Sequence, residues 1–308
     1  MQDPAFTAPG RFWRGNLHTH SNRSDGVLTP EEVCRRYRDE GYDFIALTDH
    51  FIGLYDYPIV DTVPFRTEHF TTILGAEVHS GAMENGELWH ILAVGLPLDF
   101  APSNTPHFSP VDGMETGPEL ARRCRDAGAF VAIAHPEWGG LSLADARSLQ
   151  AAHAVEVYNH GCQVGADRAE GFWHLDRLLE DGRKLTLCAT DDAHFSEPDH
   201  FGGWTMVKAE TNTPEALLAA LKAGQMYATS GPMIHDVVWK EHLVEVRCSP
   251  ASTVIVQGRG SATSAVHGSA MGQVKLPYGR VFESDWMRLT VIDADGKRAW
   301  TNPVWRRG

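Results

Sequence analysis

The stretch from residue 16 to residue 26 carries side chains that could bind a metal ion. It reads NLHTH at residues 16–20 and SDG at residues 24–26. Side chains two residues apart in a strand point to the same face, so a strand here would place His18 and His20 side by side. Asp25 offers a carboxylate in the following loop. Two imidazoles and a carboxylate suit a metal site, and two hydrogen-bonded histidines at a sheet edge are the alternative.

Candidate metal ligands recur at later apolar runs of the sequence. Seven runs are expected to form strands, and they cover residues 12–16, 42–47, 71–74, 88–94, 129–134, 154–158 and 184–189. Six of them are associated with His, Glu or Asp, and the run at 154–158 is followed by Asn159 and His160. A buried histidine explains one such residue, but not seven at a similar position. The pattern therefore predicts one site built from the ends of several strands.

Helices are expected between these strands. The helical patterns cover residues 30–40, 119–127, 143–151, 168–180 and 214–223. The first has Thr29 as its N-cap and Pro30 in its first turn. Alternating strands and helices favour parallel βα units, and in barrels of such units the active site lies at the carboxyl ends of the strands. Residues 51–66 and 97–118 are expected to form loops, the second as a lid or rim.

The end of the chain has a different pattern. Residues 243–247, 253–256 and 287–292 alternate between apolar and polar side chains, and Asp295-Gly296 is typical of a hairpin turn. We therefore expect an α/β barrel domain at residues 11–232 and a small antiparallel, sandwich-like β module at residues 233–308, packed on the barrel. The module contains no cluster of candidate ligands.

The composition restricts the class of function. The chain has 308 residues and a formal net charge of −13, which opposes binding to a long nucleic acid. No apolar run approaches the ~18 residues of a membrane span, and residues 1–10 lack the features of a signal peptide. The five cysteines include no CxxC pair, which favours reduced thiols and a cytoplasmic protein. The sequence leaves the oligomeric state open.

The ordered set of motifs resembles the polymerase and histidinol phosphatase (PHP) superfamily. The matching motifs are His18-Thr19-His20, Asp25-Gly26, Thr48-Asp49-His50, Gly75-Ala76-Glu77, Trp89-His90-Ile91-Leu92, Ala134-His135-Pro136 and Asp192-Ala193-His194. The sequences YATSGP at 227–232 and WTNP at 300–303 are similar to stand-alone PHP metallohydrolases that carry a C-terminal β module. Some relatives in that branch are carbamate hydrolases. The resemblance implies a distorted seven-stranded (β/α) barrel.

The resemblance also implies ligands for two or three divalent metal ions. One ion would be held by His18, His20, Glu77 and Asp192, a second by Glu77, His90 and His135, and a third by Asp25, His50 and His194. Glu77 would bridge two ions. The family pattern selects Asp192 over its neighbour Asp191, and His90 over the competing His79. Mixed imidazole and carboxylate ligands suit zinc, manganese or iron and do not choose among them.

These ligands predict a metal-dependent phosphoesterase acting on a small phosphorylated metabolite or nucleotide. A bound metal lowers the pKa of its water from roughly 15.7 to about 7, and a metal-bridging hydroxide would attack phosphorus in line. The expected catalytic residues are Glu77, Asp192 and His194, and either of the last two would serve as the acid for the leaving group.

Substrate binding and two other functions stay open at this point. His160, Arg23 and His200 are expected to bind the substrate, because they lie in loops near the candidate ligands. The same metals would also suit hydrolysis of a carbamate, ester or amide, and the scarcity of Lys and Arg near the strand ends leaves that alternative open. A non-catalytic metal-binding module is the second alternative, and the full ligand set weighs against it.

Overall fold

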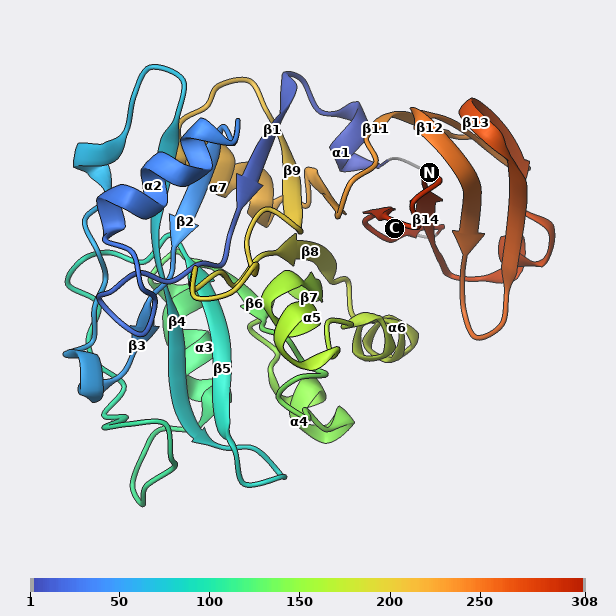
Figure 1. Cartoon of the computed structure of the whole chain (residues 1–308). Coiled ribbons are helices and arrows are strands. Elements are labelled where there is room, and N and C mark those ends of the chain that lie inside the picture. The colour runs from blue at the N-terminus through green and yellow to red at the C-terminus, as the bar shows by residue number, and fades with distance from the viewer. Residues whose placement is uncertain (1–2, 307–308) are drawn as a thin grey trace.

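The protein is described over residues 3–306 in a computed structural model, and one 16-stranded sheet runs through this part of the chain (Figure 1). In chain order the strands are β1 (Arg11–Asn16), β2 (Phe44–Leu47), β3 (His50–Phe51), β4 (Thr71–Ala82), β5 (Leu88–Val94), β6 (Phe130–Ile133), β7 (Ala154–Asn159), β8 (Thr186–Thr190), β9 (Trp204–Ala209), β10 (Met226–Thr229), β11 (Ile234–Trp239), β12 (Leu243–Gln257), β13 (Thr263–Pro277), β14 (Trp286–Ile292), β15 (Arg298–Thr301) and β16 (Val304–Trp305).

Short and medium-length helices connect these strands. The α-helices are α1 (Pro4–Thr7), α2 (Pro30–Asp39), α3 (Gly117–Asp126), α4 (Leu143–Ser148), α5 (His160–Ala166), α6 (Phe172–Glu180) and α7 (Pro214–Lys222), and the 3-10 helices are η1 (Gly53–Tyr55), η2 (Val63–Phe65) and η3 (Gly279–Glu283). None of the helices within residues 3–306 is long and apolar enough to span a membrane.

The predicted elements are largely present. The seven predicted strands of the α/β part (residues 11–232) correspond to β1, β2, β4, β5, β6, β7 and β8, and the five predicted helices to α2, α3, α4, α6 and α7. Sequence analysis missed α5, β9 and β10, and it placed β3 at the edge of a loop. The alternating runs near the end of the chain lie in β12, which contains two of them, and in β14.

Strand β5 departs from the predicted parallel pattern. The pairs β1–β2, β2–β4, β6–β7 and β7–β8 are parallel, but β5 is antiparallel to both β4 and β6. Only residues 83–87 connect β4 to β5, which is too short for a helical crossover. The chain reverses there in a turn that contains Gly86 at a φ of 85°.

Strand pairing alone does not close the seven predicted strands into a barrel. β1 pairs with β2 on one side and with β9 on the other, so β8 is not its neighbour along the sheet. The carboxyl ends of β1 and β8 still meet. The backbone N–H of His20 donates to the carbonyl of Ala193 (2.9 Å), and that of Asp192 donates to the carbonyl of His18 (2.8 Å). Candidate ligands from distant parts of the sequence are thereby brought together.

Helix α2 holds the segment after β1 in place. Its first turn is capped by Thr29, whose hydroxyl accepts a hydrogen bond from the backbone N–H of Glu32 (3.2 Å). The buried face of the helix includes Tyr37, whose hydroxyl accepts from Asn16 Nδ2 (2.8 Å) and donates to Asp191 Oδ2 (2.8 Å). One tyrosine therefore links α2 to the last residue of β1 and to the residue that follows β8.

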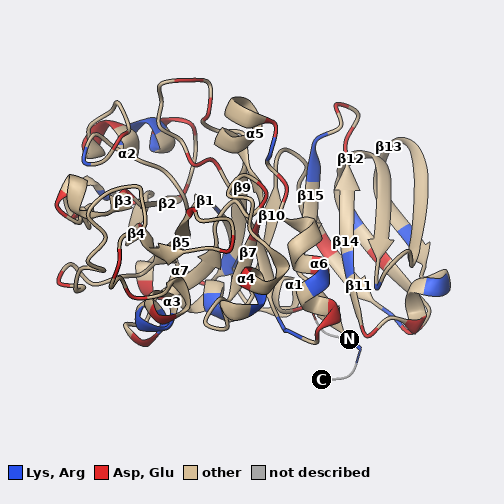
Figure 2. Cartoon of the chain, turned by 90° about the horizontal axis from the view of Figure 1, so that it is seen from below, with Lys and Arg blue, Asp and Glu red and all other residues tan. Residues whose placement is uncertain are grey.

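The sheet continues from the α/β part into the β module (residues 233–306), because β10 pairs with β15 (Figure 2). Asn302 adds side-chain contacts at this junction. Its Nδ2 donates to the carbonyls of Gly224 (2.9 Å) and Met226 (3.0 Å), and its Oδ1 accepts from the backbone N–H of Leu187 (2.9 Å). The two parts stand side by side, with acidic and basic residues interspersed on both (Figure 2).

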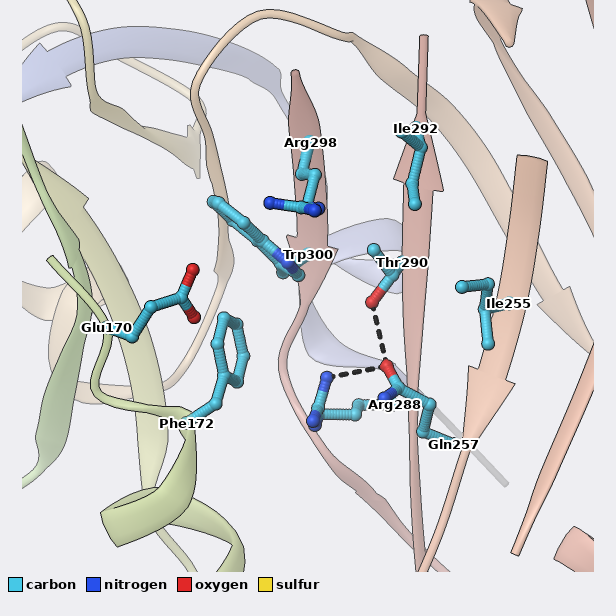
Figure 3. A pocket seen from close by; sticks show the side chains of 9 residues that line it. All are labelled: Glu170, Phe172, Ile255, Gln257, Arg288, Thr290, Ile292, Arg298 and Trp300. Atoms are coloured by element: carbon cyan, nitrogen blue, oxygen red, sulfur yellow. Dashed lines mark hydrogen bonds between the residues drawn. The ribbon is translucent and has the colours of Figure 1, made fainter. Parts of the chain in front are cut away.

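A second contact between the two parts surrounds Arg288 of β14 (Figure 3). The guanidinium pairs with Asp176 of α6 (3.1 Å), donates to Gln257 Oε1 (2.8 Å) and lies over the ring of Phe172 (4.4 Å). Arg288, Gln257 and Phe172 border an open groove of about 370 Å³, with Trp300 on its wall. Because Arg288 is only 4% exposed, its partners compensate a buried charge and fix the module against α6.

Candidate metal centre

The nine predicted metal ligands lie together at one edge of the sheet. They are His18 and His20 after β1, Asp25 in the following loop, His50 in β3, Glu77 in β4, His90 near the start of β5, His135 after β6, and Asp192 and His194 after β8. Because β5 is antiparallel to β4, its start lies beside the carboxyl-terminal half of that strand. The reversed strand therefore still delivers His90 to the cluster.

The ligand atoms form compact groups. Within each of the following groups, one ligand atom from every residue lies within 4.8 Å of the others: His20, Asp25, His50 and His194; His18, Glu77 and His135; His18, His20 and Asp192; and His50, Glu77 and His79. The first group contains the trio predicted for a third ion, with His20 added. The assignment of each residue to a particular ion stays a prediction.

Glu77 occupies the centre of the cluster. Its Oε1 lies 2.7 Å from His90 Nδ1 and 3.0 Å from His135 Nε2. Its Oε2 lies 2.7 Å from His50 Nδ1 and 3.5 Å from His18 Nε2. The residue is fully buried. One carboxylate thus faces imidazoles on both sides, as a bridging ligand must.

The protonation of His18 provides a test of whether a metal fits. Its Nδ1 lies 3.0 Å from Glu156 Oε1, and a carboxylate can only accept, so Nδ1 carries a proton. In the neutral ring Nε2 then presents a lone pair toward Glu77 Oε2 (3.5 Å) and Asp192 Oδ1 (3.2 Å). Neither His18 Nε2 nor Glu77 Oε2 has a hydrogen-bond partner among the described residues. Converging lone pairs of this kind fit a divalent cation.

The electrostatics of the cluster also favour a cation. Burial opposes the charged form of His18, but Asp192, Glu156 and Glu77 raise its pKa well above the usual range. Burial likewise opposes charge on His50, and Glu77 and Asp25 raise its pKa to about 10. Neutral imidazoles do not offset the negative charge of these carboxylates. Either protons on the imidazoles or bound metal ions would neutralise it.

Glu156 is a functional residue that sequence analysis missed. This fully buried carboxylate on β7 accepts hydrogen bonds from His18 Nδ1 (3.0 Å), the backbone N–H of His135 (2.6 Å), Asn159 Nδ2 (3.0 Å) and the Thr190 hydroxyl. It orients one candidate ligand by its side chain and another by its backbone. The sequence does contain one indication of this role, because Glu156 is an acidic residue in the middle of the apolar run at 154–158.

The neighbours Asp191 and Asp192 point in different directions. Asp192 lies 2.9 Å from His20 Nε2, and its left-handed φ of 55° is unusual for a residue other than glycine. Asp191 instead accepts from the backbone N–H groups of Phe201 (2.9 Å), Gly202 (2.8 Å) and Gly203 (2.9 Å), and so organises a loop. This arrangement agrees with the choice of Asp192 as the candidate ligand.

His79 contacts the candidate ligand His50 and the backbone of Trp89. Its Nδ1 lies 3.1 Å from the carbonyl of Trp89, so that nitrogen is the donor and Nε2 the acceptor. His79 Nε2 lies 2.9 Å from His50 Nδ1, which turns His50 Nε2 toward Asp25 Oδ2 at 3.3 Å. His79 is fully buried, whereas His90 borders the cavity. This geometry suits His79 for orienting His50.

A cavity of about 320 Å³ opens over the cluster. It is lined by Asp25, His50, Glu77, Glu87, Leu88, His90, Phe108, His135, Trp138, Asp192 and His194. Phe108 comes from the loop predicted as a lid or rim, and its ring lies 4.9 Å from that of His50. No Lys or Arg of the described chain lines this cavity.

The three residues predicted to bind substrate lie outside this cavity. Arg23 lines a separate hollow near α2. The ring of His160 lies beside Tyr158, whose hydroxyl is 3.2 Å from His160 Nδ1. His200 stacks on Phe195, with 5.0 Å between ring centroids. A role for these residues in substrate binding stays a prediction, and the aromatic residues at the cavity were not among the sequence-based choices.

Comparisons with known proteins show what this chain is similar to. Residues 16–100 match the PHP domain family, and they include six of the nine candidate ligands. An uncharacterized protein of Methanocaldococcus jannaschii is 24% identical over 209 residues, which cover 67% of this chain and 84% of the relative. An amidohydrolase from Chromobacterium violaceum, solved with bound sulfate and no metal, is 17% identical with a TM-score of 0.46, over 60% of this chain and 89% of that one.

One similar structure extends over both parts of the molecule. It is a two-domain protein from Bacteroides vulgatus, described as containing a predicted PHP-like metal-dependent phosphoesterase. The two proteins are 16% identical with a TM-score of 0.51, and the similarity covers 99% of each chain. This likeness shows a shared fold that includes the β module. Within this fold, residues 16–100 are the part of the chain that matches the PHP domain family.

Proposed function

We propose that the protein is a metal-dependent hydrolase that cleaves a phosphate ester of a small molecule. The observation that carries the proposal is the convergence of His18 Nε2, Glu77 Oε2 and Asp192 Oδ1 below a cavity of about 320 Å³. Such a donor set would hold divalent ions of zinc, manganese or iron. The ions, two or three in number, would be bound by His18, His20, Asp25, His50, Glu77, His90, His135, Asp192 and His194.

The metals, when bound, would supply an activated water at neutral pH and offset the negative charge of the reacting phosphate. The side chains would hold this arrangement in place: Glu77 sets the spacing of the imidazoles around it, and Glu156 and His79 orient His18 and His50. A correctly oriented ligand set reduces the reorganisation needed during the reaction.

His194 is the best-placed proton donor for the leaving group. It borders the cavity, and its Nε2 lies 3.3 Å from Asp25 Oδ1. Burial opposes its charged form, but Asp25 and Asp192 raise the pKa of His194 to about 9. In a centre of two ions that leaves His194 without a metal, the ring would be protonated at neutral pH and would deliver its proton to a departing alkoxide or phenolate; in a centre of three ions His194 would be a ligand instead.

The cavity favours a small substrate over a long nucleic acid. Its volume matches a metabolite-sized ligand, and Phe108 extends into it from the long loop before α3. The net charge of −13 opposes docking of a polyanion over an extended surface. Binding would then depend on contacts within the cavity itself.

One observation supports a carbamate, ester or amide substrate as the second candidate. The cavity has apolar walls formed by Leu88, Phe108 and Trp138, and none of its described lining residues is a Lys or Arg. A neutral carbonyl group would need no cationic clamp.

Steady-state kinetics of metal-loaded protein on 4-nitrophenyl phosphate and a 4-nitrophenyl carbamate would decide between the two, because the leaving group is the same. We expect a higher kcat/KM for the phosphate and competitive inhibition by inorganic phosphate. A higher kcat/KM for the carbamate, with no inhibition by millimolar phosphate, would overturn the proposal.

A further inference from the structure

The cavity above the metal centre lies next to a second hollow. The first has a volume of about 320 Å³ and the second about 390 Å³. They share four lining residues, which are Glu87, Leu88, His90 and Trp138. A molecule held at the metal centre therefore has room to extend past His90 into the second hollow.

The walls of the second hollow are tied to each other. One wall is the hairpin between β4 and β5, and the other is the turn after β6. Asn85 at the hairpin donates from Nδ2 to the carbonyl of Gly139 (2.8 Å) and, more weakly, to that of Gly140 (3.3 Å). These bonds hold the two walls at a fixed separation, so the hollow is part of the folded structure.

An exposed aromatic ring stands between the two hollows. Trp138 is 44% exposed and borders both. Its ring meets that of His135 edge to face, with 4.9 Å between centroids, and it lies 5.5 Å from that of His90. Such a large exposed indole beside a candidate reaction centre offers a stacking surface for a planar group. Leu88 adds apolar surface to the same passage.

Charge is distributed unevenly along the passage. Glu87 lines both hollows and disfavours an anionic group between them. Arg168 lies in the second hollow only, and it is the one Lys or Arg among the described residues that line either hollow. The one arginine among the described lining residues is therefore found beyond the aromatic ring, away from the metal centre.

We propose that the substrate is an aromatic molecule that carries a second anionic group on the far side of its ring. The scissile group would lie at the metal centre, the ring would stack on Trp138, and the distal carboxylate or phosphate would pair with Arg168. This inference rests on the proposed hydrolase function for the identity of the scissile group. The stacking and charge recognition come from the passage itself.

Binding of non-hydrolysable phosphonates to the metal-loaded protein tests the inference separately from catalysis. The probes are phenylphosphonate and its 4-carboxy, 4-carboxymethyl and 4-(2-carboxyethyl) derivatives, which place the carboxylate at three distances. By calorimetry we expect at least one derivative to bind about fivefold more tightly than phenylphosphonate, as a charge-assisted contact at a partly exposed site would give. Arg168→Gln should remove this preference and leave phenylphosphonate binding within about twofold.

Matched controls separate the two contacts. Arg280→Gln, an exposed arginine in the β module, should retain the preference. Trp138→Ala should weaken all aryl phosphonates about tenfold relative to methylphosphonate, whereas Trp173→Ala on α6, where the indole is 57% exposed, should not. Equal binding of all four aryl probes by the wild-type protein, or a preference retained in Arg168→Gln, would overturn the inference. Binding with the expected preference but no hydrolysis of the matching phosphate esters would instead count against the proposed function.

Discussion

Replacing Glu156 with Gln should weaken metal binding although Glu156 is not a candidate ligand. Its Oε1 accepts from His18 Nδ1 and from the hydroxyl of Thr190, and its Oε2 accepts from the backbone N–H of His135 and from Asn159. A Gln amide must place its NH₂ group at one of these two positions. At Oε2 it would face two donors, whereas at Oε1 the hydroxyl of Thr190 can rotate and accept.

The tolerated orientation of the Gln side chain, with its NH₂ group at the Oε1 position, changes the protonation of His18. The amide NH₂ would oppose a proton on Nδ1, so the ring would shift its proton to Nε2, which faces Glu77 Oε2 and Asp192 Oδ1. A proton would then occupy the direction in which the lone pair must bind the metal. Loss of an orienting partner of this kind typically lowers metal affinity about 10–100-fold, and loss of a charge-assisted hydrogen bond costs about 1.5–3 kcal/mol of stability.

Competitive zinc titration with a chelator of known affinity measures the first effect, and urea unfolding measures the second. Folded variant protein, checked by circular dichroism, should also show the changed His18 tautomer in ¹⁵N NMR spectra of its imidazoles. Glu68→Gln, an exposed position, is the matched control and should leave affinity and stability unchanged. If Glu156→Gln bound the first equivalent of zinc within twofold of the wild type, the positioning argument would be wrong.

Further predictions concern the metal content, the ligand assignment and one half-buried histidine. Protein purified without chelator should carry two or three divalent ions per chain by elemental analysis, and chelation should abolish activity; less than one equivalent, without recovery on adding Mn²⁺ or Zn²⁺, would contradict the metal centre. Glu77→Gln should reduce kcat by orders of magnitude, whereas Asp191→Asn should mainly lower the unfolding temperature, and equal losses of kcat with metal retained would refute this distinction. His153 accepts from the backbone N–H of Val131 (3.1 Å), and burial, aided by nearby cations, lowers its pKa to about 4. The unfolded state then binds more protons than the folded state between pH 6.5 and about 4, so the free energy of unfolding falls as the pH decreases through this window. In His153→Asn, which keeps a hydrogen-bond acceptor, urea unfolding should show a smaller fall in this free energy over the same window. A fall equal to that of the wild type would exclude His153 as a contributor.

Local sequence signals were sufficient for most of the candidate site. His18 and His20 are recognisable because the two-residue period of a strand puts them on one face, and Glu77, His135 and Asp192 follow buried runs that the sequence marks clearly. The candidate ligands converge because the elements that carry them share one sheet edge. A short polar connection with a glycine, at residues 83–87, also indicates the reversal between β4 and β5. The alternation of strands and helices along the rest of the chain favours parallel strands instead.

The missed features depend on tertiary contacts. The role of Glu156 becomes clear when β7 is seen next to the residues that follow β1 and β6, since these partners are far away in sequence. His160 was expected in the pocket because it follows a strand, but Asn159 caps α5 at that point and the chain turns away. The exposed positions of Trp138 and Arg168 along the passage depend on how loops from three connections pack, which no local pattern specifies.

The contacts of Asn302 affect the order in which the molecule can be completed during its synthesis. A chain leaves the ribosome from its N-terminus, so the strands that carry the candidate ligands are available long before Asn302. Until that residue arrives, the N–H of Leu187 in β8 lacks its side-chain acceptor and β10 lacks its partner β15, which leaves an open strand edge. The nascent α/β part thus exposes an unpaired edge close to the strand that leads into Asp192. Protection of that edge in the cell falls to a segment that is made later than the α/β part, and the β module would in this sense complete the folding of the domain that precedes it.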